Sequence, residues 1–494
     1  MLIQVIYEET KEAARAAMEK PHPAADAVEI RLDPLGDCDP GEFLGNGKLP
    51  VVVTSRTPDS GGSFRLDRQK RQAQLERSFE AGAAYVDLEF ETDDEAWISR
   101  KGNSRIILSA HFPEGMPDDI EDLYGKMSQR TGVDVLKIVP FAHSLTDNLR
   151  IRQLLKRARR EGKNLAAFCM GAKGAVSRIL ALAWGSWATF ASSRPGRESA
   201  GGQFTVEELS ERFRVKEIGE GTRLLGVVGF PLGHSLSPLI HNRALRETGI
   251  DSCYLPFETE MLGEFLPLPE ALNLAGFSVT LPYKETIREH LDEVDATAAR
   301  LGAVNTVVKK GNRLVGSNTD VPAALRVLER AHPVKDRTVA ILGAGGAGRA
   351  LAFGLRERGA RLIIHNRTVE RARALAAELG CRSGALEDCG REPCDILINA
   401  TPVGMHPSAG EMPVPAAAIR AGMVFDLVYN PRETRLLREA RKKGCRTLEG
   451  LEMFLEQAAD QFRMFTGTEA PLGVMRRAAE EALGGPKNSD FNDG

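Results

Sequence analysis

The sequence lacks an excess of charge of either sign. Its 65 lysines and arginines are set against 68 aspartates and glutamates, which leaves a formal net charge of −3 at pH 7. A protein that holds a nucleic-acid backbone needs a positive field to neutralise the phosphates. The charge balance therefore argues against nucleic acid as a partner.

Cysteines are few, and their spacing in the sequence forms no recognisable motif. The seven cysteines are scattered, odd in number and include no Cys-x-x-Cys pair. Such a distribution suggests neither a disulfide framework nor a zinc site. We expect reduced thiols in a cytosolic protein, and no metal.

Long hydrophobic runs are also missing. The most apolar stretch, residues 179–193, is interrupted by serine and is shorter than the ~20 residues that a membrane helix needs. The first ten residues are acidic and the apolar run there is short, unlike a signal peptide. We expect a soluble cytoplasmic protein with no membrane partner.

What is present is the composition of a globular protein with several domains. The 494 residues suffice for about three domains of roughly 150 residues each. Hydrophobic residues make up 42% and charged residues 27%, close to the averages of soluble proteins, so sizeable cores can form. No internal repeat is found.

The first 200 residues alternate short apolar runs with charged helical segments. This alternation predicts eight strands with helices between most of them, which indicates an α/β protein that begins with a compact (β/α)8 barrel. The eight expected strands are Leu2–Tyr7, Ala27–Leu32, Pro50–Ser55, Tyr85–Phe90, Arg105–Ala110, Asp134–Val139, Asn164–Cys169 and Trp187–Ser192.

A glycine-rich turn lies in the second half of the chain. Gly343, Gly345 and Gly348 form G-x-G-x-x-G between an apolar strand and a helix, and a second strand ends at His365. In this context the motif predicts a dinucleotide pyrophosphate at a helix N-terminus, in a Rossmann lobe. The candidate contacts in the turn are Gly343, Ala344, Gly345, Gly346, Ala347 and Gly348.

The residues after the second strand predict which dinucleotide binds. An NAD site carries an acidic residue there, but this chain reads Asn366-Arg367-Thr368. Arg367, with Arg371 one helical turn later, offers guanidinium donors to a 2′-phosphate. We therefore expect NADP (NADPH) as the cofactor, bound by Asn366, Arg367, Thr368 and Arg371.

The region of about residues 222–482 resembles the shikimate dehydrogenases. The resemblance rests on motifs in the expected order, namely GVVGFPLGHSLSPLIHN, GFSVTLPYKE, GAVNTVV, SNTD, GAGGAGRA, NRT, NATPVGM, DLVYNP and LEGLEMFLEQAADQF. It implies a two-lobed dehydrogenase with an α/β substrate lobe and a Rossmann NADP-binding lobe. Ser278 stands where many single-domain bacterial members carry Asn, as in the plant two-domain enzymes.

The same resemblance assigns the dehydrogenase site. A lysine with a carboxylate partner can exchange a proton with a hydroxyl or ketone, and the family match favours this role for Lys284 and Asp320 over a plain surface salt bridge. The substrate contacts it implies are Ser235, Ser237, Thr280, Asn305, Tyr429 and Gln457. The contacts on the cofactor side are Thr401, Met405 and Gly450, with Tyr429 and Gly450 lining the closed cleft.

In the barrel region, Lys137 interrupts an apolar strand. A lysine among aliphatic side chains is costly unless it deprotonates, and a neutral lysine can attack a ketone to form an imine. The alternative is an outward-facing side chain whose charged end reaches solvent. The residues alone leave these two interpretations nearly equal.

Residues 1 to about 214 resemble the type I 3-dehydroquinate dehydratases. The motifs EIRLD, SRT, SAHF, LKIV, SRI and ESAGGQ fall near the carboxyl ends of strands, where barrel enzymes hold their active sites. The resemblance makes Lys137 the Schiff-base lysine and His111 the general base, with His143 as a rival base. The substrate contacts it implies are Glu29, Arg31, Arg56, Arg178, Ser199 and Gln203.

Two departures from that family pattern stand out. Ser60 precedes Gly61-Gly62 where the family usually has Glu, so His111 lacks a carboxylate partner unless Asp59 replaces it. The first strand begins at residue 2, so an N-terminal hairpin that closes the bottom of the barrel is missing. The second departure is expected to affect stability.

The two resemblances together imply a bifunctional enzyme. It dehydrates 3-dehydroquinate and then reduces 3-dehydroshikimate to shikimate, as a monomer or homodimer. The alternatives are a non-catalytic metabolite sensor built from the same domains and a dehydrogenase half that acts on quinate; retention of all four candidate catalytic residues favours the enzyme. The expected domains are a dehydratase barrel (1–214), a substrate lobe (222–330, completed by 451–482), an NADP lobe (331–450) and a disordered tail (483–494).

Overall fold

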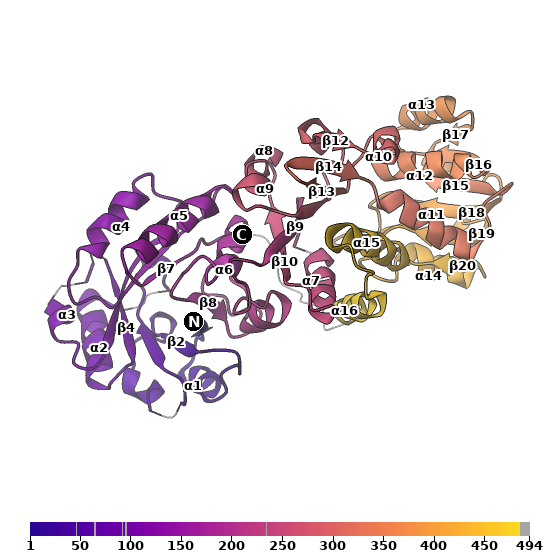
Figure 1. Ribbon diagram of the computed structural model, residues 1–494. Helices are drawn as coiled ribbons and strands as arrows, with labels where there is room; N and C mark the ends of the chain where they lie inside the picture. The colour runs from indigo at the N-terminus through magenta and orange to yellow at the C-terminus, as the bar shows by residue number, and fades with distance from the viewer. Residues whose placement is uncertain (46, 64–65, 91, 94–95, 234, 485–494) are drawn as a thin grey trace. The chain divides into compact units, whose positions relative to one another are not determined.

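The computed structural model describes residues 1–45, 47–63, 66–90, 92–93, 96–233 and 235–484 (Figure 1). The chain divides into two compact units. Among the described residues, unit 1 contains Met1–Leu224 and Asp251–Asn273, and unit 2 contains Leu225–Ile250 and residues 274–484. Three sheets organise these units, one of eight strands and two of six.

The eight-stranded sheet confirms the predicted barrel. Its order is β7-β6-β5-β4-β3-β2-β1-β8, and each pair along it is parallel. The amide of Trp187 donates to the carbonyl of Leu165 (2.8 Å) and so links the two ends of the sheet. The strands are β1 Leu2–Ile6, β2 Ala27–Arg31, β3 Val51–Thr54, β4 Tyr85–Glu89, β5 Arg105–Phe112, β6 Val135–Pro140, β7 Leu165–Ala167 and β8 Thr189–Ser192.

Alternation along the strands divides the barrel residues between two cores. Ile107, Val135 and Phe190 belong to the core inside the barrel, whereas Val86 and Ile138 pack against the surrounding helices. Because side chains alternate along a strand, residue 137 shares the interior face with Val135. The helices are α1 Lys11–Glu19, α2 Arg68–Glu80, α3 Ala96–Ser99, α4 Ile120–Ser128, α5 Asp147–Arg160 and α6 Ala175–Leu180.

The second sheet is mixed, with the order β10-β9-β11-β13-β14-β12. β9 and β11 are parallel, while β13 and β14 form an antiparallel hairpin. The strands are β9 Arg223–Gly229, β10 Ser252–Glu258, β11 Gly276–Val279, β12 Glu293–Val294, β13 Thr306–Lys310 and β14 Arg313–Ser317. The helices near them in sequence are α7 Ser237–Glu247, α8 Leu262–Phe265, α9 Leu268–Ala271 and α10 Ala296–Leu301.

The third sheet confirms the Rossmann lobe. Its order is β17-β16-β15-β18-β19-β20 with every pair parallel, which is the 3-2-1-4-5-6 order of a dinucleotide-binding fold. The strands are β15 Thr338–Leu342, β16 Arg361–His365, β17 Arg382–Gly384, β18 Cys394–Asn399, β19 Ala421–Asp426 and β20 Arg446–Leu448. The helices are α11 Asp320–Ala331, α12 Gly346–Glu357, α13 Val369–Leu379 and α14 Arg435–Lys442.

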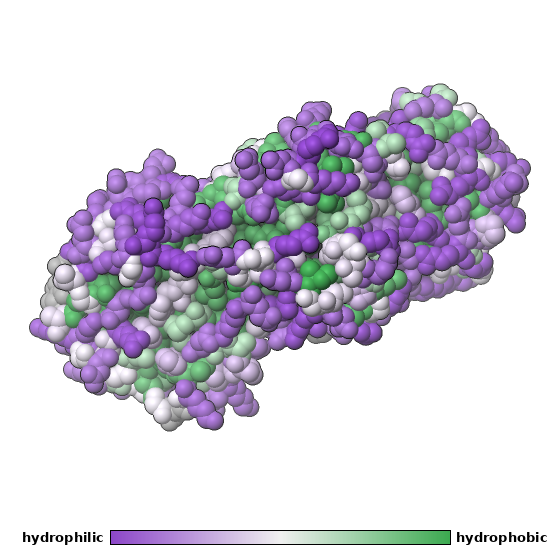
Figure 2. All heavy atoms as spheres, in the orientation of Figure 1, coloured by the Kyte–Doolittle hydropathy of each residue, from purple (hydrophilic) through white to green (hydrophobic). Residues whose placement is uncertain are grey.

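The last two helices return to the earlier lobe of unit 2. α15 (Gly450–Thr466) packs against α7, α11 and β13, and α16 (Leu472–Gly484) packs against α7. Of the predicted tail, residues 483–484 end α16, and residues 485–494 lie outside the described residues. Within the described part of the chain, no helix combines the length and apolarity needed to cross a bilayer, and hydrophilic side chains cover most of the face in Figure 2.

Candidate active sites

Lys137 lies inside the barrel, on β6. Its side chain is only 5% exposed, and its Nζ donates to Asp87 Oδ2 (3.1 Å) and Glu29 Oε1 (3.3 Å). The Nζ also lies 4.0 Å from the centre of the Phe190 ring. The predicted alternative, an outward-facing lysine, is therefore wrong, because the strand register turns residue 137 towards the interior.

Sequence reasoning missed two acidic residues of this site, Asp87, which pairs with Lys137, and Glu89, whose Oε1 lies 3.5 Å from Arg56 Nη1. Asp87 and Glu89 occupy alternate positions of β4, so both side chains point into the barrel. Arg56 donates to Asp87 Oδ2 (2.9 Å) and to Ser109 (2.7 Å). Burial raises the pKa of Asp87, but Arg56 and Lys137 outweigh it and hold this pKa below its usual range. The sequence did contain a signal for them, since two acidic residues at alternate positions of an apolar strand indicate a polar site on one face of that strand.

His111 lies near the end of β5 and is the best-placed neutral base in the barrel. Burial, together with the positive charges of Arg56 and Lys137, lowers the pKa of His111 well below its ordinary value. The imidazole is therefore neutral at physiological pH. Its buried Nδ1 has no hydrogen-bond partner among the described residues.

A cavity of about 290 Å³ brings all eight predicted barrel residues together. It opens at the carboxyl ends of the strands, as expected for a barrel enzyme. Apolar side chains, including Val139, Phe168 and Phe190, complete its wall. The predicted residues in the lining are Glu29, Arg31, Arg56, His111, Lys137, Arg178, Ser199 and Gln203.

Arg178 supplies a positive charge to this cavity. Its side chain is 1% exposed and stacks over Phe168, with the guanidinium carbon 4.8 Å from the ring centre. No carboxylate of the described residues pairs with it, and its Nε has no hydrogen-bond partner there. Burial lowers the pKa of Arg178 to about 10. An anionic ligand would relieve this unpaired buried charge.

Ser199 and Gln203 come from the loop that follows β8. Gln203 Oε1 accepts from the Ser199 amide (2.8 Å) and hydroxyl (3.2 Å). The rival base His143 lies outside the cavity lining, exposed, with its Nε2 2.8 Å from the carbonyl of Glu114. Ser60 lines the cavity, whereas Asp59 is exposed and does not, so Asp59 does not replace the family's carboxylate.

The second site lies in unit 2 and is built around a lysine–aspartate pair. Lys284 follows β11, and its Nζ donates to Asp320 Oδ2 (2.7 Å) at the first residue of α11. Their side chains are 31% and 20% exposed, so the pair remains accessible to a small molecule. This is the contact that the motifs PYKE and SNTD predicted.

The other predicted substrate contacts are held by backbone and neighbouring side chains. Asn305 Oδ1 accepts from the Thr319 amide (2.8 Å) and from Thr306 Oγ1 (2.8 Å), which fixes the orientation of its amide. Gln457 Nε2 donates to the Phe454 carbonyl (2.9 Å). Thr280 is tied to β9 through its amide, and Ser235 and Ser237 lie at the start of α7.

Tyr429 stacks on Phe454, with ring centres 4.3 Å apart. Burial raises the pKa of Tyr429 to about 12, and the charge of Asp320 contributes. The phenol is therefore protonated and can donate a hydrogen bond. Ser278, by contrast, donates to Gln461 (2.9 Å), a residue of α15 that sequence reasoning did not single out.

The glycine turn has the shape that a bound dinucleotide needs. A Cβ on Gly348 would lie 2.1 Å from the Gly343 carbonyl oxygen, so only glycine lets α12 pack this close to the turn. A Cβ on Gly345, the N-cap of α12, would meet nothing within 4 Å, which leaves open space at the helix N-terminus. Asn366 Oδ1 accepts from the Ala344 amide (3.1 Å) and holds the turn against the end of β16.

Residues around the turn fit NADP. Arg367 and Arg371 are exposed, and neither guanidinium pairs with another described residue, so both are available to a 2′-phosphate. Thr401 is positioned by Asn399, and the side chain of Met405 is exposed. Gly450 has a packing role, since a Cβ there would lie 2.5 Å from the Val428 carbonyl oxygen.

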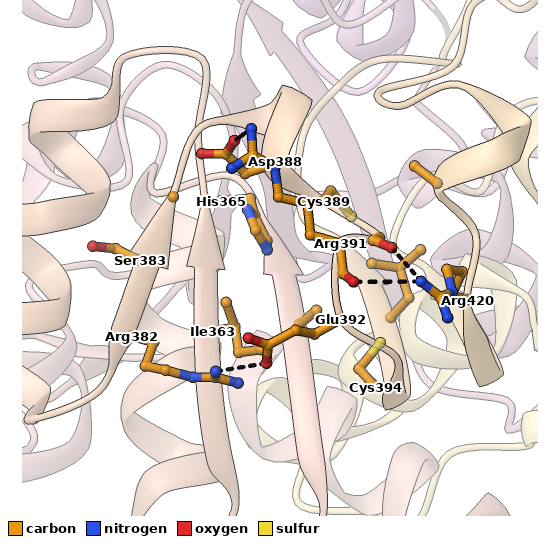
Figure 3. A pocket seen from close by; sticks show the side chains of 15 residues that line it. Ile363, His365, Arg382, Ser383, Asp388, Cys389, Arg391, Glu392, Cys394 and Arg420 are labelled. Atoms are coloured by element: carbon orange, nitrogen blue, oxygen red, sulfur yellow. Dashed lines mark hydrogen bonds and ion pairs between the residues drawn. The ribbon is translucent and has the colours of Figure 1, made fainter.

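A separate cavity of about 180 Å³ lies in the Rossmann lobe beside β16 and β17 (Figure 3). Its arginines already have partners. Arg382 pairs with Glu392 and Arg391 with Asp388, while Arg420 donates to two backbone carbonyls. None of the predicted site residues lines this cavity.

Comparison with known proteins identifies each part of the chain. Family models match in succession: Type I 3-dehydroquinase over residues 2–220, Shikimate dehydrogenase substrate binding domain over 227–307, Shikimate / quinate 5-dehydrogenase over 326–434 and Shikimate 5'-dehydrogenase C-terminal domain over 450–480. The fold and the two sites thus define a lysine-bearing barrel fused to a dinucleotide-binding dehydrogenase.

Individual relatives cover the whole arrangement or its second part. An Arabidopsis thaliana protein named "Bifunctional 3-dehydroquinate dehydratase/shikimate dehydrogenase, chloroplastic" is 37% identical over 477 residues, covering 90% of this chain and 78% of the relative. "Shikimate dehydrogenase (NADP(+))" of Thermococcus kodakarensis is 45% identical and covers 53% of this chain and 97% of its own. The chain belongs to the family of bifunctional 3-dehydroquinate dehydratase/shikimate dehydrogenases.

A solved structure of a shikimate dehydrogenase in complex with NADP+ resembles the second part. It has a TM-score of 0.50 and 39% sequence identity, and it covers 53% of this chain and 96% of its own.

Proposed function

We propose that this chain catalyses two consecutive reactions. The barrel dehydrates 3-dehydroquinate to 3-dehydroshikimate, and unit 2 reduces 3-dehydroshikimate to shikimate with NADPH. The observation that carries the proposal is the presence of two lysine–carboxylate constellations in one chain, Lys137 with Glu29 and Asp87, and Lys284 with Asp320.

In the barrel, Lys137 is the nucleophile. Its ammonium must lose a proton before it attacks a ketone, and Glu29 and Asp87 are the acceptors in contact with it. Attack on the carbonyl carbon and loss of water give an imine, which withdraws electrons from the adjacent carbon. Neutral His111 removes the proton from that carbon and returns it to the departing hydroxyl. Water then hydrolyses the imine and frees Lys137.

The remaining barrel residues hold the substrate. Arg178 is the unpaired buried cation of the cavity, and it binds the substrate carboxylate together with Ser199 and Gln203. The hydroxyl groups of the substrate face Glu29, Arg31 and Arg56.

In unit 2, NADPH supplies a hydride when it is bound. Lys284 donates a proton to the ketone oxygen, and Asp320 holds the lysine in place and accepts a proton from it in the reverse direction. Ser235 and Ser237 bind the carboxylate. The ring hydroxyls are contacted by Thr280, Asn305 and Gln457. Protonated Tyr429, which stacks on Phe454, donates a hydrogen bond to the substrate.

The geometry of the glycine turn supports the proposed cofactor contacts. The amides at the start of α12 face the pyrophosphate, and Arg367 with Arg371 binds the 2′-phosphate. Thr401 and Met405 lie on the nicotinamide side. We assign the dehydratase to residues 1–214, the substrate lobe to 222–330 with 451–482, and the NADP lobe to 331–450.

A coupled assay tests the proposal directly. Purified chain receives 3-dehydroquinate and NADPH, and the oxidation of NADPH is followed by absorbance. A dehydrogenase that reduces 3-dehydroshikimate has no substrate until the barrel produces it, so both sites are needed. Chromatographic identification of the product as shikimate excludes direct reduction of 3-dehydroquinate to quinate. Absence of oxidation, while added 3-dehydroshikimate is reduced, would refute the barrel function alone. A parallel assay that follows the reduction of NADP+ in the presence of quinate tests the alternative dehydrogenase substrate. No turnover of any of these compounds would favour a sensor.

Location and assembly form the last part of the proposal. All seven cysteines are free thiols, which favours a reducing compartment such as the cytoplasm. A monomer or a homodimer is expected. Cell fractionation and sedimentation velocity of the full chain measure these two properties.

A further inference from the structure

The loop after β1 holds a buried carboxylate that the proposed mechanism does not use. Glu8 is 2% exposed, although it lies in a loop between β1 and α1. Arg194 Nη2 donates to both of its carboxylate oxygens (2.9 and 3.0 Å), and Arg197 Nε lies 3.3 Å from Oε2. A buried carboxylate with two guanidinium partners is costly to leave unpaired.

Both arginines belong to the segment that completes the dehydratase cavity. Residues 193–204 follow β8 and are here named the β8 loop. This loop carries four residues of the cavity lining, Ser199, Ala200, Gly201 and Gln203. β1 and β8 are neighbouring parallel strands, so the loops that follow them leave the sheet side by side. Glu8 is therefore placed to fasten the β8 loop.

Among the described residues, other contacts also attach this loop, including the Ser192 amide, which donates to the Phe204 carbonyl (2.9 Å), and the exposed ion pair of Arg197 with Glu9 (3.3 Å). The Gly171 amide donates to the Gly201 carbonyl (2.8 Å), and Gln203 Nε2 reaches the Phe190 carbonyl at 3.4 Å. The contacts of Gln203 with Ser199 lie within the loop itself and do not attach it to the barrel. The two arginine contacts at Glu8 are thus the only ion pairs from the described β8 loop to a buried group.

We propose that Glu8 is a positioning residue for the dehydratase. It holds Arg194 and Arg197, and through them it keeps Ser199 and Gln203 at the cavity where they bind the substrate carboxylate. This inference rests on the proposed dehydratase function. Ser199 and Gln203 contact a group that does not react, so they stabilise the bound substrate and the transition state equally. Loss of such contacts raises KM and leaves kcat nearly unchanged.

The test uses the full chain without NADPH, so that only dehydration is measured, by the ultraviolet absorbance of the conjugated product. Glu8→Gln keeps the shape of the side chain and removes its charge. We expect its KM for 3-dehydroquinate to rise about tenfold, with kcat within twofold of the wild type. Glu9→Gln is the matched control, because Glu9 is 75% exposed and contacts Arg197 alone.

A double-mutant cycle separates positioning from a general structural effect. If Glu8 acts through Arg194, then Arg194→Gln raises KM in the wild type but adds little to Glu8→Gln. Independent, multiplicative effects of the two substitutions on KM would overturn the proposal, as would an unchanged KM in Glu8→Gln.

Folding of the variants is checked within the same chain. All three tryptophans, Trp97, Trp184 and Trp187, lie in unit 1, so their fluorescence reports the barrel. Should Glu8→Gln fail to fold, Arg194→Gln decides alone, because Arg194 is 58% exposed; an unchanged KM in this variant would overturn the proposal. A wild-type chain without dehydratase turnover would instead refute the proposed function.

Discussion

At the scale of single residues, the barrel site is defined by which charges are paired and which are not. Lys137 lies between two carboxylates, whereas Arg178 and the His111 Nδ1 have no such partner among the described residues. Paired groups can exchange protons in the resting enzyme. Unpaired buried groups are satisfied only when a ligand or water meets them.

Reductive trapping identifies the nucleophile. Borohydride reduces an imine to a stable secondary amine, so treatment of the chain with 3-dehydroquinate and borohydride is expected to attach the ligand to Lys137. Peptide mass spectrometry locates the modified residue, and Lys137→Met serves as the unlabelled control. Modification at another residue, or none during active turnover, would remove the imine mechanism.

Ser60 offers a test of the histidine's environment. Since the pKa of His111 is lowered, dehydratase kcat/KM is expected to stay constant as the pH falls from 8 to well below the ordinary histidine value. Ser60→Glu is expected to retain or raise activity, and to move the acidic limb of the profile to higher pH, because a nearby carboxylate favours the imidazolium. A fall in kcat/KM of about tenfold, or about 1.4 kcal/mol, would show that the cavity is built around the serine.

Arg367 is expected to determine the choice of cofactor. Charge-assisted hydrogen bonds are worth about 1.5 to 3 kcal/mol each, so NADP should be favoured over NAD by at least about tenfold in kcat/KM. Arg367→Ala should reduce this ratio by weakening the use of NADP, with the use of NAD little changed. Arg373→Ala, on the helix α13 that follows Arg367, is the control. An Arg367→Ala enzyme that still strongly prefers NADP would contradict the assignment.

At the scale of elements, Asp426 joins the ends of three segments of the Rossmann lobe. It terminates β19 and accepts from Asn399 of β18 (2.9 Å), from the Val428 amide (3.1 Å) and from Thr434, the N-cap of α14 (2.6 Å). Burial raises the pKa of Asp426 to about 6, although these hydrogen bonds oppose the shift. The carboxylate thus orders the loop that leads to Tyr429 at a cost in stability.

This cost predicts a pH-dependent stability. Because the folded-state pKa lies above the ordinary value of 3.8, the carboxyl contributes stability at low pH that is lost as the pH rises through about 6. Asp426→Asn remains neutral, so it should raise the free energy of unfolding by about 3 kcal/mol at pH 7.5. The difference should disappear near pH 4.

Urea titration measures this difference at several pH values. Circular dichroism follows the unfolding, and the loss of dehydrogenase activity marks the transition of unit 2. Equal stabilisation at pH 4 and pH 7.5 would show that the effect does not come from ionisation of Asp426.

At the scale of the whole molecule, each proposed activity has its own core. The barrel core and the Rossmann core consist of different residues, and each site lies within one unit. Separate cores predict separable activities.

Selective inactivation tests this independence. Lys137→Met should reduce dehydration at least about a thousandfold and leave the oxidation of shikimate within about twofold of the wild type. Lys284→Met and Asp320→Asn should do the reverse. Both activities are measured on the same preparation, and loss of both in a folded variant would show that the sites depend on each other.

The sequence by itself determined the order of strands and helices, the glycine turn and the Lys284–Asp320 pair. The strand order and the turn depend on periodicity and on conformations that favour glycine, which are local. The lysine–aspartate pair was predicted through the family resemblance of the motifs PYKE and SNTD. The tertiary structure decided which barrel residues face inward. All six residues of β6 are buried, so hydropathy cannot distinguish the cavity from the helix layer. Only the strand register turns Lys137, Asp87 and Glu89 into the barrel, and only the pairing of β1 with β8 brings Glu8 to the arginines of the β8 loop. Charges more than one hundred residues apart in the chain then pair at contact distance, which no local pattern encodes.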